Sequence, residues 1–351
     1  MRPILAVTAG LLVTALVAAG VTLAILQLQS RTNTQQVNLR NGVTITEDSA
    51  IIAAAGKARP AVVSIVTQHQ PNLVRGSGYL ATSDGYIVTN INVLAGATGM
   101  TVLIPSDSKA HDARLVDYDC QTGVAVIKID KVSGLPTLGF ADPNALVQGQ
   151  RIVAVGGPVE GGAVTPAYVS AMHRVSSVRD PVNLGRTLQL SDTIQTNAAL
   201  DGGTSGGPLV NVGSQVVGVA MESTSAISGV GLNVADIQDD VQQILQTGQV
   251  LVSSLGATTS DVTADSAALN GVPEGSRLVG LDSGGPAAIA GLKAGDVIIQ
   301  LDDVKLDAAH PLSLLLRSRF HANQRVTVTY SRDGVSTQAE LTLTSQHPAC
   351  A

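Results

Sequence analysis

Short apolar runs separated by Gly, Asp, Asn and Pro extend from residue 61 to about residue 235. The clearest runs, in which Val is the commonest residue, cover residues 61–66, 124–129, 151–155 and 215–220. Apolar runs of about four to seven residues between turn formers are typical of β-strands. Strands repeated this often along a chain indicate an antiparallel sandwich or barrel, so the pattern predicts an all-β body.

At both ends of this β region the spacing of the apolar residues changes from that of a strand to that of a helix. Residues 236–245 place apolar side chains on one face of a helix, at Ile237, Val241, Ile244 and Leu245. We expect this helix to close the body. At the other end, residues 51–55 are apolar and rich in Ala, with Asp48 or Ser49 available as a cap. The body is therefore expected to start with a helix as well.

The first thirty residues carry the strongest hydropathy signal. Residues 3–30 contain no ionisable side chain, and residues 4–26 are apolar apart from three threonines. A helix of that length crosses the ~30 Å apolar core of a bilayer, whereas the apolar core of a cleaved signal peptide is about 7–15 residues long. Segment 1–30 is therefore predicted to be an uncleaved transmembrane helix, with cleavage after residues 18–20 as the alternative. Residues 31–48, rich in Gln, Asn and Thr, are expected to form a flexible linker.

The amino-acid composition and the net charge exclude some functional classes for this protein. The chain has 351 residues, 44% of them apolar, but no Trp and only two Phe, so its cores must consist of Val, Leu, Ile and Ala. A net charge of −6 without a Lys/Arg cluster excludes a nucleic-acid-binding protein, which needs a concentrated positive surface. No Cys or His spacing suggests a metal site, and no glycine-rich phosphate loop suggests a nucleotide, so we expect no cofactor.

The chain has two cysteines, Cys120 and Cys350. They could form a disulfide in an oxidising compartment. Because terminal residues are usually loose, we expect them to stay apart. Asp119, beside Cys120, is expected to end a strand and accept turn hydrogen bonds.

Four motifs follow one another in the order and spacing of a known family. They are Gly-Ser-Gly-Tyr at 76–79, Asp-Gly-Tyr-Ile-Val-Thr-Asn at 84–90, the run 118–126, and the run 194–209 that includes Ser-Gly-Gly-Pro-Leu. Together they resemble the HtrA/Deg family of trypsin-like bacterial serine proteases, and the resemblance covers nearly everything after residue 48. It implies a protease-like domain at 49–247, built of two packed β-barrels that meet between Asp142 and Leu146, with the active cleft between them.

The resemblance also assigns the catalytic positions, and two of the three are degenerate. Ser205 is at the nucleophile position, Asn92 replaces the triad histidine and Gly123 replaces the triad aspartate. A carboxamide has no basic lone pair near neutral pH, so it cannot take the serine proton. The amides of Gly203 and Ser205 are the expected oxyanion hole. Lys128 is a conceivable substitute base, although nothing in its spacing selects it.

Residues 285–298 resemble the most recognisable stretch of a PDZ domain, an α+β fold with a partly open β-barrel. The resemblance implies a PDZ domain at 248–347, followed by a tail at 348–351. Such a domain captures a peptide as an added strand and holds its terminal carboxylate on backbone amides. The expected carboxylate turn is Leu255-Gly256-Ala257, and residues 311–320 are the expected groove helix. Alternatively, Gly256 is an ordinary glycine at the entry to a strand.

These features predict a pseudoprotease anchored by one helix in a bacterial cell membrane, with its body on the extracytoplasmic side. The PDZ domain would bind unfolded or C-terminal peptides, in envelope protein quality control, sensing or scaffolding. The alternative is an active HtrA-type endopeptidase that uses Ser205 with a non-standard base. A third reading, from the trimers that the family tends to form, is a structural subunit in a homotrimer or in an assembly with active relatives.

Overall fold

The computed structural model describes residues 47–69, 72–107, 109–179, 187–222, 228–308 and 310–348. The predicted transmembrane segment, nearly all of the linker and the end of the tail lie outside these residues. In the part of the chain that is described, no helix combines the length and the apolar character needed to cross a membrane.

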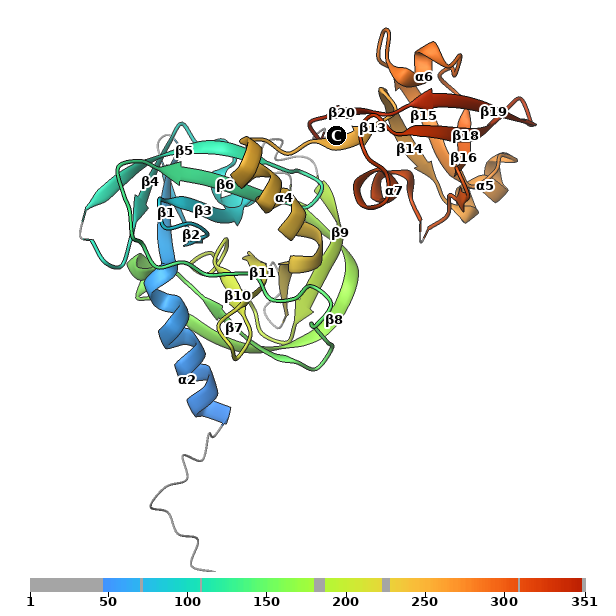
Figure 1. The fold of residues 1–351 in the computed structure, drawn as a ribbon. Coiled ribbons are helices and arrows are strands. Elements are labelled where there is room, and N and C mark those ends of the chain that lie inside the picture. Colours follow the sequence, from blue (N-terminus) through green and yellow to red (C-terminus); the bar gives the residue numbers. More distant parts are fainter. Residues whose placement is uncertain are drawn as a thin grey trace, which may run out of the picture. The chain divides into compact units, whose positions relative to one another are not determined.

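The first half of the body is a closed barrel of six antiparallel strands (Figure 1). In the order in which they pair, the strands are β1 (Val62–His69), β2 (Asn72–Leu80), β3 (Tyr86–Asn90), β6 (Val124–Ile129), β5 (Ala110–Tyr118) and β4 (Gly99–Leu103). The strands expected at 61–66 and 124–129 are thus confirmed, and every residue of β6 is buried. Between β3 and β4 the chain forms one helical turn, α3 (Ile91–Leu94).

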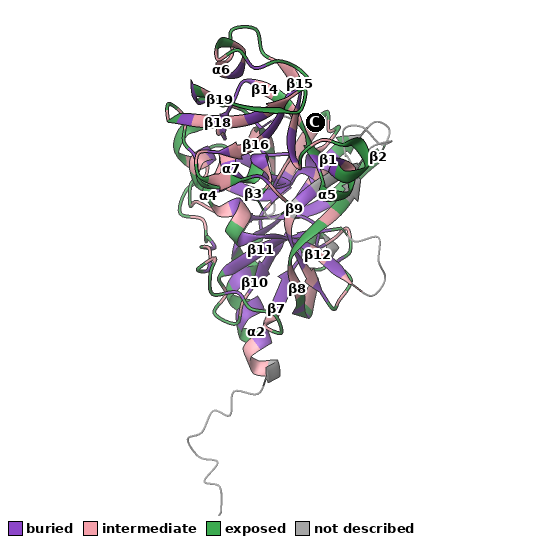
Figure 2. Cartoon of the chain, turned by 90° about the vertical axis from the view of Figure 1, so that its right-hand side faces the viewer, coloured by how far each residue is buried: buried purple, intermediate pink, exposed green. Residues whose placement is uncertain are grey.

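A second closed barrel follows. Its strands pair in the order β10 (Pro208–Val210), β11 (Val216–Met221), β12 (Gly229–Asn233), β9 (Thr187–Thr196), β8 (Val164–Arg179) and β7 (Arg151–Val155). The runs 151–155 and 215–220 thus form strands as expected, and Figure 2 shows β10 and β11 as buried. The prediction of an all-β body with two barrels is confirmed.

Helices flank the barrels at both ends of the body. Helix α2 (Glu47–Ala58) and the 3-10 turn η1 (Arg59–Ala61) precede β1, and a second 3-10 turn, η2 (Pro158–Glu160), lies between β7 and β8. The helix predicted at 236–245 is α4 (Val234–Thr247). Its N-cap is Asn233, whose side chain accepts a hydrogen bond from the Ala235 amide, and Ile237, Val241 and Ile244 are buried as the pattern predicts.

The remaining described residues form the PDZ fold with a core of its own. Its sheet has the strand order β14 (Ala257–Val262), β15 (Gly275–Leu281), β16 (Val297–Leu301), β18 (Arg325–Arg332) and β19 (Val335–Thr342), with β17 (Val304–Lys305) on β16. A separate pair joins β13 (Val252–Ser254) to β20 (Thr344–Gln346). The helices are α5 (Ala264–Asn270), α6 (Pro286–Ile289) and α7 (Leu312–Ser318), the last within the expected groove helix.

Cys120 is buried and disulfide-bonded. The expectation that its thiol stays free is therefore wrong. Cys350, the other cysteine of the sequence, lies outside the described residues. Asp119 behaves as expected, because its Oδ1 accepts a turn hydrogen bond from the Gln121 amide at 2.7 Å.

Candidate functional site

Ser205 lies in a tightly wound turn directly before β10. Its backbone amide donates to Asp201 O at 3.0 Å, and the Thr204 amide donates to the same oxygen at 3.1 Å and to Asp201 Oδ1 at 2.9 Å. Asp201 thus caps the turn with both its backbone and its side chain. The Ser205 residue is 4% exposed, so substrate has little direct access to its hydroxyl in this conformation.

The Ser205 hydroxyl oxygen accepts hydrogen bonds from two donors. One is Asn90 Nδ2 at 2.9 Å and the other is the Glu222 backbone amide at 3.2 Å. A carboxamide N–H and a peptide N–H cannot take up a proton. The described surroundings of the nucleophile position therefore hold the oxygen in place without activating it.

Asn90 is fully buried and is the residue that the sequence analysis missed. It is the N-cap of α3, where its Oδ1 accepts from the Val93 amide at 3.0 Å. Its Nδ2 donates to Ala220 O at 2.8 Å in addition to Ser205. The one sequence signal is an asparagine directly before a short apolar turn, which predicts a cap but not a contact with a residue so distant in the chain.

Asn92, at the histidine position, has no comparable set of bonds. It is half-buried on α3, and its Oδ1 is shielded from solvent without a hydrogen-bond partner in the described structure. An unpaired buried oxygen usually costs stability. Nothing in the contacts of Asn92 links it to the Ser205 hydroxyl.

Gly123, at the aspartate position, has a left-handed backbone with φ of +78°. Its carbonyl accepts from the Ile91 amide at 2.9 Å, so its loop supports the start of α3. A Cβ atom at this position would lie 3.2 Å from a methyl group of Leu190 and 3.2 Å from one of Leu232. The site is thus shaped for a residue without a side chain.

The turn that would form the oxyanion hole is fastened to the first barrel through Ser77. The Ser77 hydroxyl donates to Gly203 O at 2.6 Å and accepts from the Gly157 amide at 2.7 Å, while the Ser77 amide donates to Ser205 O at 2.7 Å. Because the Ser205 amide already donates to Asp201 O, an oxyanion could be bound there only after that bond breaks.

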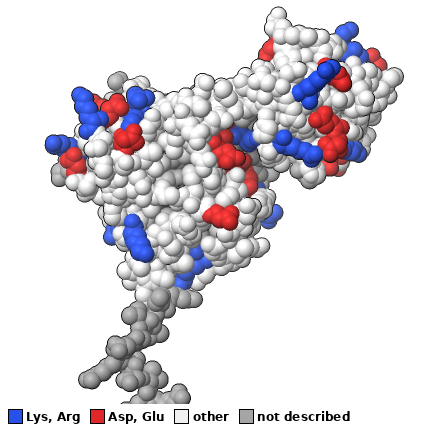
Figure 3. Space-filling model, in the orientation of Figure 1, with Lys and Arg blue, Asp and Glu red and all other residues white. Residues whose placement is uncertain are grey.

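The alternative base, Lys128, points to other partners. Its ammonium group bonds to the Asp84 backbone oxygen, lies 3.2 Å from Asp84 Oδ2 and sits over the Tyr86 ring at 4.5 Å from the centroid. It therefore anchors the β2–β3 turn. Among the described residues, no group of His, Cys, Asp and Glu could hold a metal ion, and Figure 3 shows Lys and Arg mixed with Asp and Glu on the face that it draws.

The expected carboxylate turn has the backbone of a tight turn. Gly256 has φ of +66°, and a Cβ there would lie 2.7 Å from Pro286 Cδ. The Leu255 carbonyl accepts from the Ala287 amide at 2.8 Å, and the Gly256 amide donates to Ser254 Oγ at 2.9 Å. Ala257 begins β14, which pairs with β15 alone and is thus an edge strand of the described sheet.

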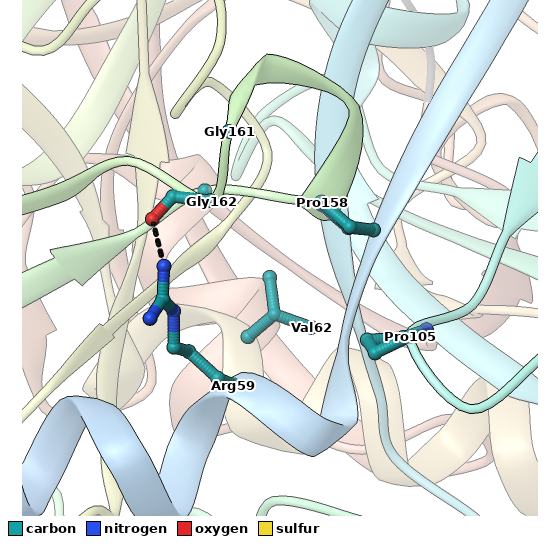
Figure 4. A pocket seen from close by; sticks show the side chains of 7 residues that line it. Arg59, Val62, Pro105, Pro158, Gly161 and Gly162 are labelled. Atoms are coloured by element: carbon teal, nitrogen blue, oxygen red, sulfur yellow. Dashed lines mark hydrogen bonds between the residues drawn. The ribbon is translucent and has the colours of Figure 1, made fainter.

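A cavity of about 230 Å³ lies beside Arg59 (Figure 4). Arg59 Nη2 donates to Gly162 O at 2.8 Å, and the other lining residues are Val62, Pro105, Gly156, Pro158 and Gly161. None of the predicted site residues lines this cavity.

Comparison with models of protein families identifies the protease-like domain and the PDZ domain. Residues 76–219 match the trypsin-like peptidase domain, and residues 218–343 match the PDZ domain. A probable periplasmic serine endoprotease DegP-like from Halomonas elongata is 35% identical over 275 residues, which are 72% of this chain and 56% of that relative. The chain thus spans about half the length of that relative.

Two relatives named serine protease Do-like HtrA match this chain over a larger share of their own length than the Halomonas elongata protein does. The protein from Lactococcus lactis subsp. lactis is 32% identical over 76% of this chain and 70% of its own length. The protein from Lactococcus lactis subsp. cremoris is 30% identical over 90% of this chain and 87% of its own length.

Solved structures show the same fold. The HtrA-type protease AlgW with decapeptide matches with a TM-score of 0.68 and 25% identity, covering 85% of this chain and 99% of its own. The serine endoprotease from Yersinia pestis matches with a TM-score of 0.64 and 25% identity, covering 84% of this chain and 98% of its own.

Proposed function

Because the chain belongs to the HtrA family of trypsin-like serine proteases with a PDZ domain, we propose that it is a membrane-anchored pseudoprotease. It binds exposed peptides or protein C-termini through its PDZ domain and does not cleave them. Its role is sensing, scaffolding or quality control of proteins in the bacterial envelope.

The observation that carries this proposal is the pair of donors on the Ser205 hydroxyl oxygen, Asn90 Nδ2 and the Glu222 amide. Serine attacks a carbonyl only when a base removes its proton. In triad proteases the loss of the base alone lowers kcat by about six orders of magnitude. The Ser205 amide, engaged by Asp201, is also not free to stabilise an oxyanion.

The geometry of the PDZ domain supports peptide binding. The edge strand β14 can accept an extended peptide, and the Leu255-Gly256-Ala257 turn directly precedes it, where the peptide carboxylate would lie. The related protease AlgW has been solved with a decapeptide. We therefore propose that the peptide binds along the free edge of β14, with α7, the expected groove helix, on its other side.

The location rests on the first thirty residues and on the relatives. Residues 4–26 are long and apolar enough for a transmembrane helix. The Halomonas elongata relative is named as periplasmic, and the disulfide of Cys120 fits an oxidising compartment. We place the body on the extracytoplasmic side.

A direct test uses the full chain in detergent micelles. We expect a fluorophosphonate probe to label it no more than the Ser205→Ala variant, and unfolded casein to survive incubation with either protein. A fluorescent decapeptide with an apolar, free C-terminus should bind, whereas the same peptide with an amidated C-terminus should not. Labelling or cleavage that depends on Ser205, or equal binding of the two peptides, would contradict the proposal.

The second candidate is an active serine endopeptidase, which is favoured by the names of relatives that are 30–35% identical to this chain over the matched residues. This activity requires the Ser205 turn to change its conformation and a general base to come within hydrogen-bonding distance of the Ser205 hydroxyl. Cleavage of casein by the wild type and not by Ser205→Ala would establish it.

A further inference from the structure

A buried ion cluster connects α7, α4 and the loop before Gly123. Arg317 Nη1 donates to Asp240 Oδ1 at 2.7 Å, and Arg317 Nη2 bonds to Asp119 Oδ2. The side chains of Arg317, Asp119 and Asp240 are 13%, 0% and 6% exposed. The Thr122 hydroxyl donates to Asp240 Oδ2 at 2.9 Å. The cluster is thus well shielded from solvent. Interactions between charges are stronger in such a buried site than in water.

Arg317 is placed so that it serves this cluster and not the PDZ core. Leu312 and Leu315 are the buried residues of α7. Arg317 follows Leu315 by two positions, about 200° further around the helix, and therefore projects from the opposite face. Its guanidinium binds two carboxylates at once, which fixes the orientation of the helix more firmly than a single contact would.

Asp119 in turn organises the loop that contains Gly123. Its backbone oxygen accepts from the Gly123 amide at 2.8 Å, its backbone amide donates to Val124 O at 2.9 Å, and its Oδ1 accepts from the Gln121 amide at 2.7 Å. A change in the charge of the cluster therefore acts on both the groove helix and this loop.

Further contacts stabilise the segment directly before Asp119. Asp117 Oδ2 accepts from the Val250 amide at 2.6 Å, and Asp117 Oδ1 lies 2.9 Å from His347 Nε2. The His347 ring packs edge-on against Tyr118, with 5.6 Å between the centroids. These contacts bring residues from both ends of the PDZ fold to the segment that precedes Cys120.

The cluster contains two carboxylates and one guanidinium, so it carries excess negative charge when both carboxylates are ionised. Burial, followed by repulsion from Asp119, raises the pKa of Asp240 to about 7 in spite of Arg317. Asp236 adds to the repulsion, and the Thr122 hydrogen bond opposes it. Protonation of Asp240 makes the cluster neutral while Arg317 keeps its pair with Asp119.

We propose that Arg317 is a positioning residue that fastens the groove helix α7 to the Asp119–Thr122 loop through its two carboxylate partners, Asp119 and Asp240. The inference depends on the proposed function only in treating α7 as the wall of the peptide groove. It predicts that the groove is less ordered, and binds peptide more weakly, when the guanidinium of Arg317 is removed.

Hydrogen exchange of the full chain in detergent micelles, read by mass spectrometry, tests the connection without any peptide. At a single pH, exchange in residues 119–124 and in α7 should be about tenfold faster in the Arg317→Gln variant than in the wild type, because buried hydrogen bonds between charged groups are lost. The Asp240→Asn variant keeps the pair of Arg317 with Asp119 and should exchange at an intermediate rate.

Arg319→Gln is the matched control, because Arg319 pairs with Asp303 on the surface at 2.9 Å. It should behave as the wild type does. Equal exchange in the Arg317→Gln and Arg319→Gln variants would overturn the proposal.

Peptide binding gives a second readout. The affinity for a fluorescent decapeptide with an apolar, free C-terminus should fall several-fold in Arg317→Gln and keep the wild-type value in Arg319→Gln. If the peptide binds to none of the three proteins while the exchange pattern holds, the assignment of the groove fails and the role of Arg317 stands. Equal affinities of the wild type and Arg317→Gln would contradict the effect on the groove.

Discussion

Asn90 and Ser205, which are far apart in the sequence, are joined by a hydrogen bond of 2.9 Å from the Asn90 Nδ2 to the Ser205 hydroxyl oxygen. The same carboxamide caps α3 and binds Ala220 O, so it connects the two barrels at the nucleophile position. The serine is therefore held by a structural amide, and its hydroxyl is part of the packing between the barrels.

The first prediction concerns this carboxamide. Asn90→Ala removes the side-chain acceptor of the buried Val93 amide and one of the two hydrogen bonds to Ala220 O, which keeps its bond from the Gly206 amide. We therefore expect it to lower the free energy of unfolding by about 1–3 kcal/mol. Asn92→Ala is the control, because the Asn92 Oδ1 has no partner to lose in the described structure. Chemical denaturation of the two variants should separate them, and equal losses would contradict the role given to Asn90.

The second prediction concerns the missing base. Asn92→His returns an imidazole to the histidine position, and a positioned general base contributes about 10²–10⁴-fold in rate. We expect fluorophosphonate labelling to rise by about 10²-fold over the wild type and to disappear in the variant that also carries Ser205→Ala. A folded Asn92→His variant that stays unlabelled would show that the Ser205 turn itself prevents reaction.

The third prediction is that the aspartate position resists repair. Gly123→Asp must adopt φ of +78° beside Leu190 and Leu232, and the left-handed backbone alone costs about 1–2 kcal/mol. Gly134→Asp is the control, since Gly134 has φ of +67° and open space around it. The Gly123 variant should therefore lose more unfolding free energy than the Gly134 variant. Equal losses of unfolding free energy in the two variants would mean that Leu190 and Leu232 move to accommodate the new side chain.

The fourth prediction is a pH dependence of stability. The pKa of Asp240 is raised to about 7 in the folded protein, above its ordinary value of 3.8. Its contribution to stability is thus fully present below about pH 4 and is lost as the pH rises through 7. The slope is at most about 1.4 kcal/mol per pH unit. Asp240→Asn should remove this slope, and Asp303→Asn on the surface should not, when unfolding is followed from pH 4 to pH 8.

The fifth prediction concerns the carboxylate turn. Ser254 Oγ accepts from the Gly256 amide at 2.9 Å, so it occupies a donor that a peptide carboxylate would need. Ser254→Ala should lower the stability of the free protein by about 1 kcal/mol and raise the affinity for a peptide with a free C-terminus. Fluorescence anisotropy measures this gain. An affinity that falls would show that the hydroxyl assists the ligand instead.

Local patterns were sufficient for the elements of the fold. The run 124–129 is apolar apart from Lys128 because both faces of β6 are buried, and the spacing of Ile237, Val241 and Ile244 is that of a helix packed on one side. The motif around Ser205 predicts the nucleophile position by its resemblance to the family, and that assignment stays a prediction.

Contacts between distant residues could not be predicted in this way. The role of Asn90 depends on the place where Ser205 and Ala220 come to lie, and the pairing of Arg317 with Asp119 joins residues that are 198 positions apart. The left-handed backbone of Gly123 is likewise invisible in the sequence, because glycine adopts either hand. The disulfide of Cys120 was missed because sequence alone fixes no distance between cysteines.

The backbone of Gly123 has a consequence for the history of such a chain. In the pseudoprotease that we propose, a complete triad needs both an imidazole and a carboxylate, and the carboxylate must enter a site where the methyl groups of Leu190 and Leu232 oppose a side chain. An imidazole at residue 92 can add reactivity by itself, whereas an aspartate at residue 123 would cost folding stability before it added turnover. Evolutionary recovery of the triad would therefore stop after its first step.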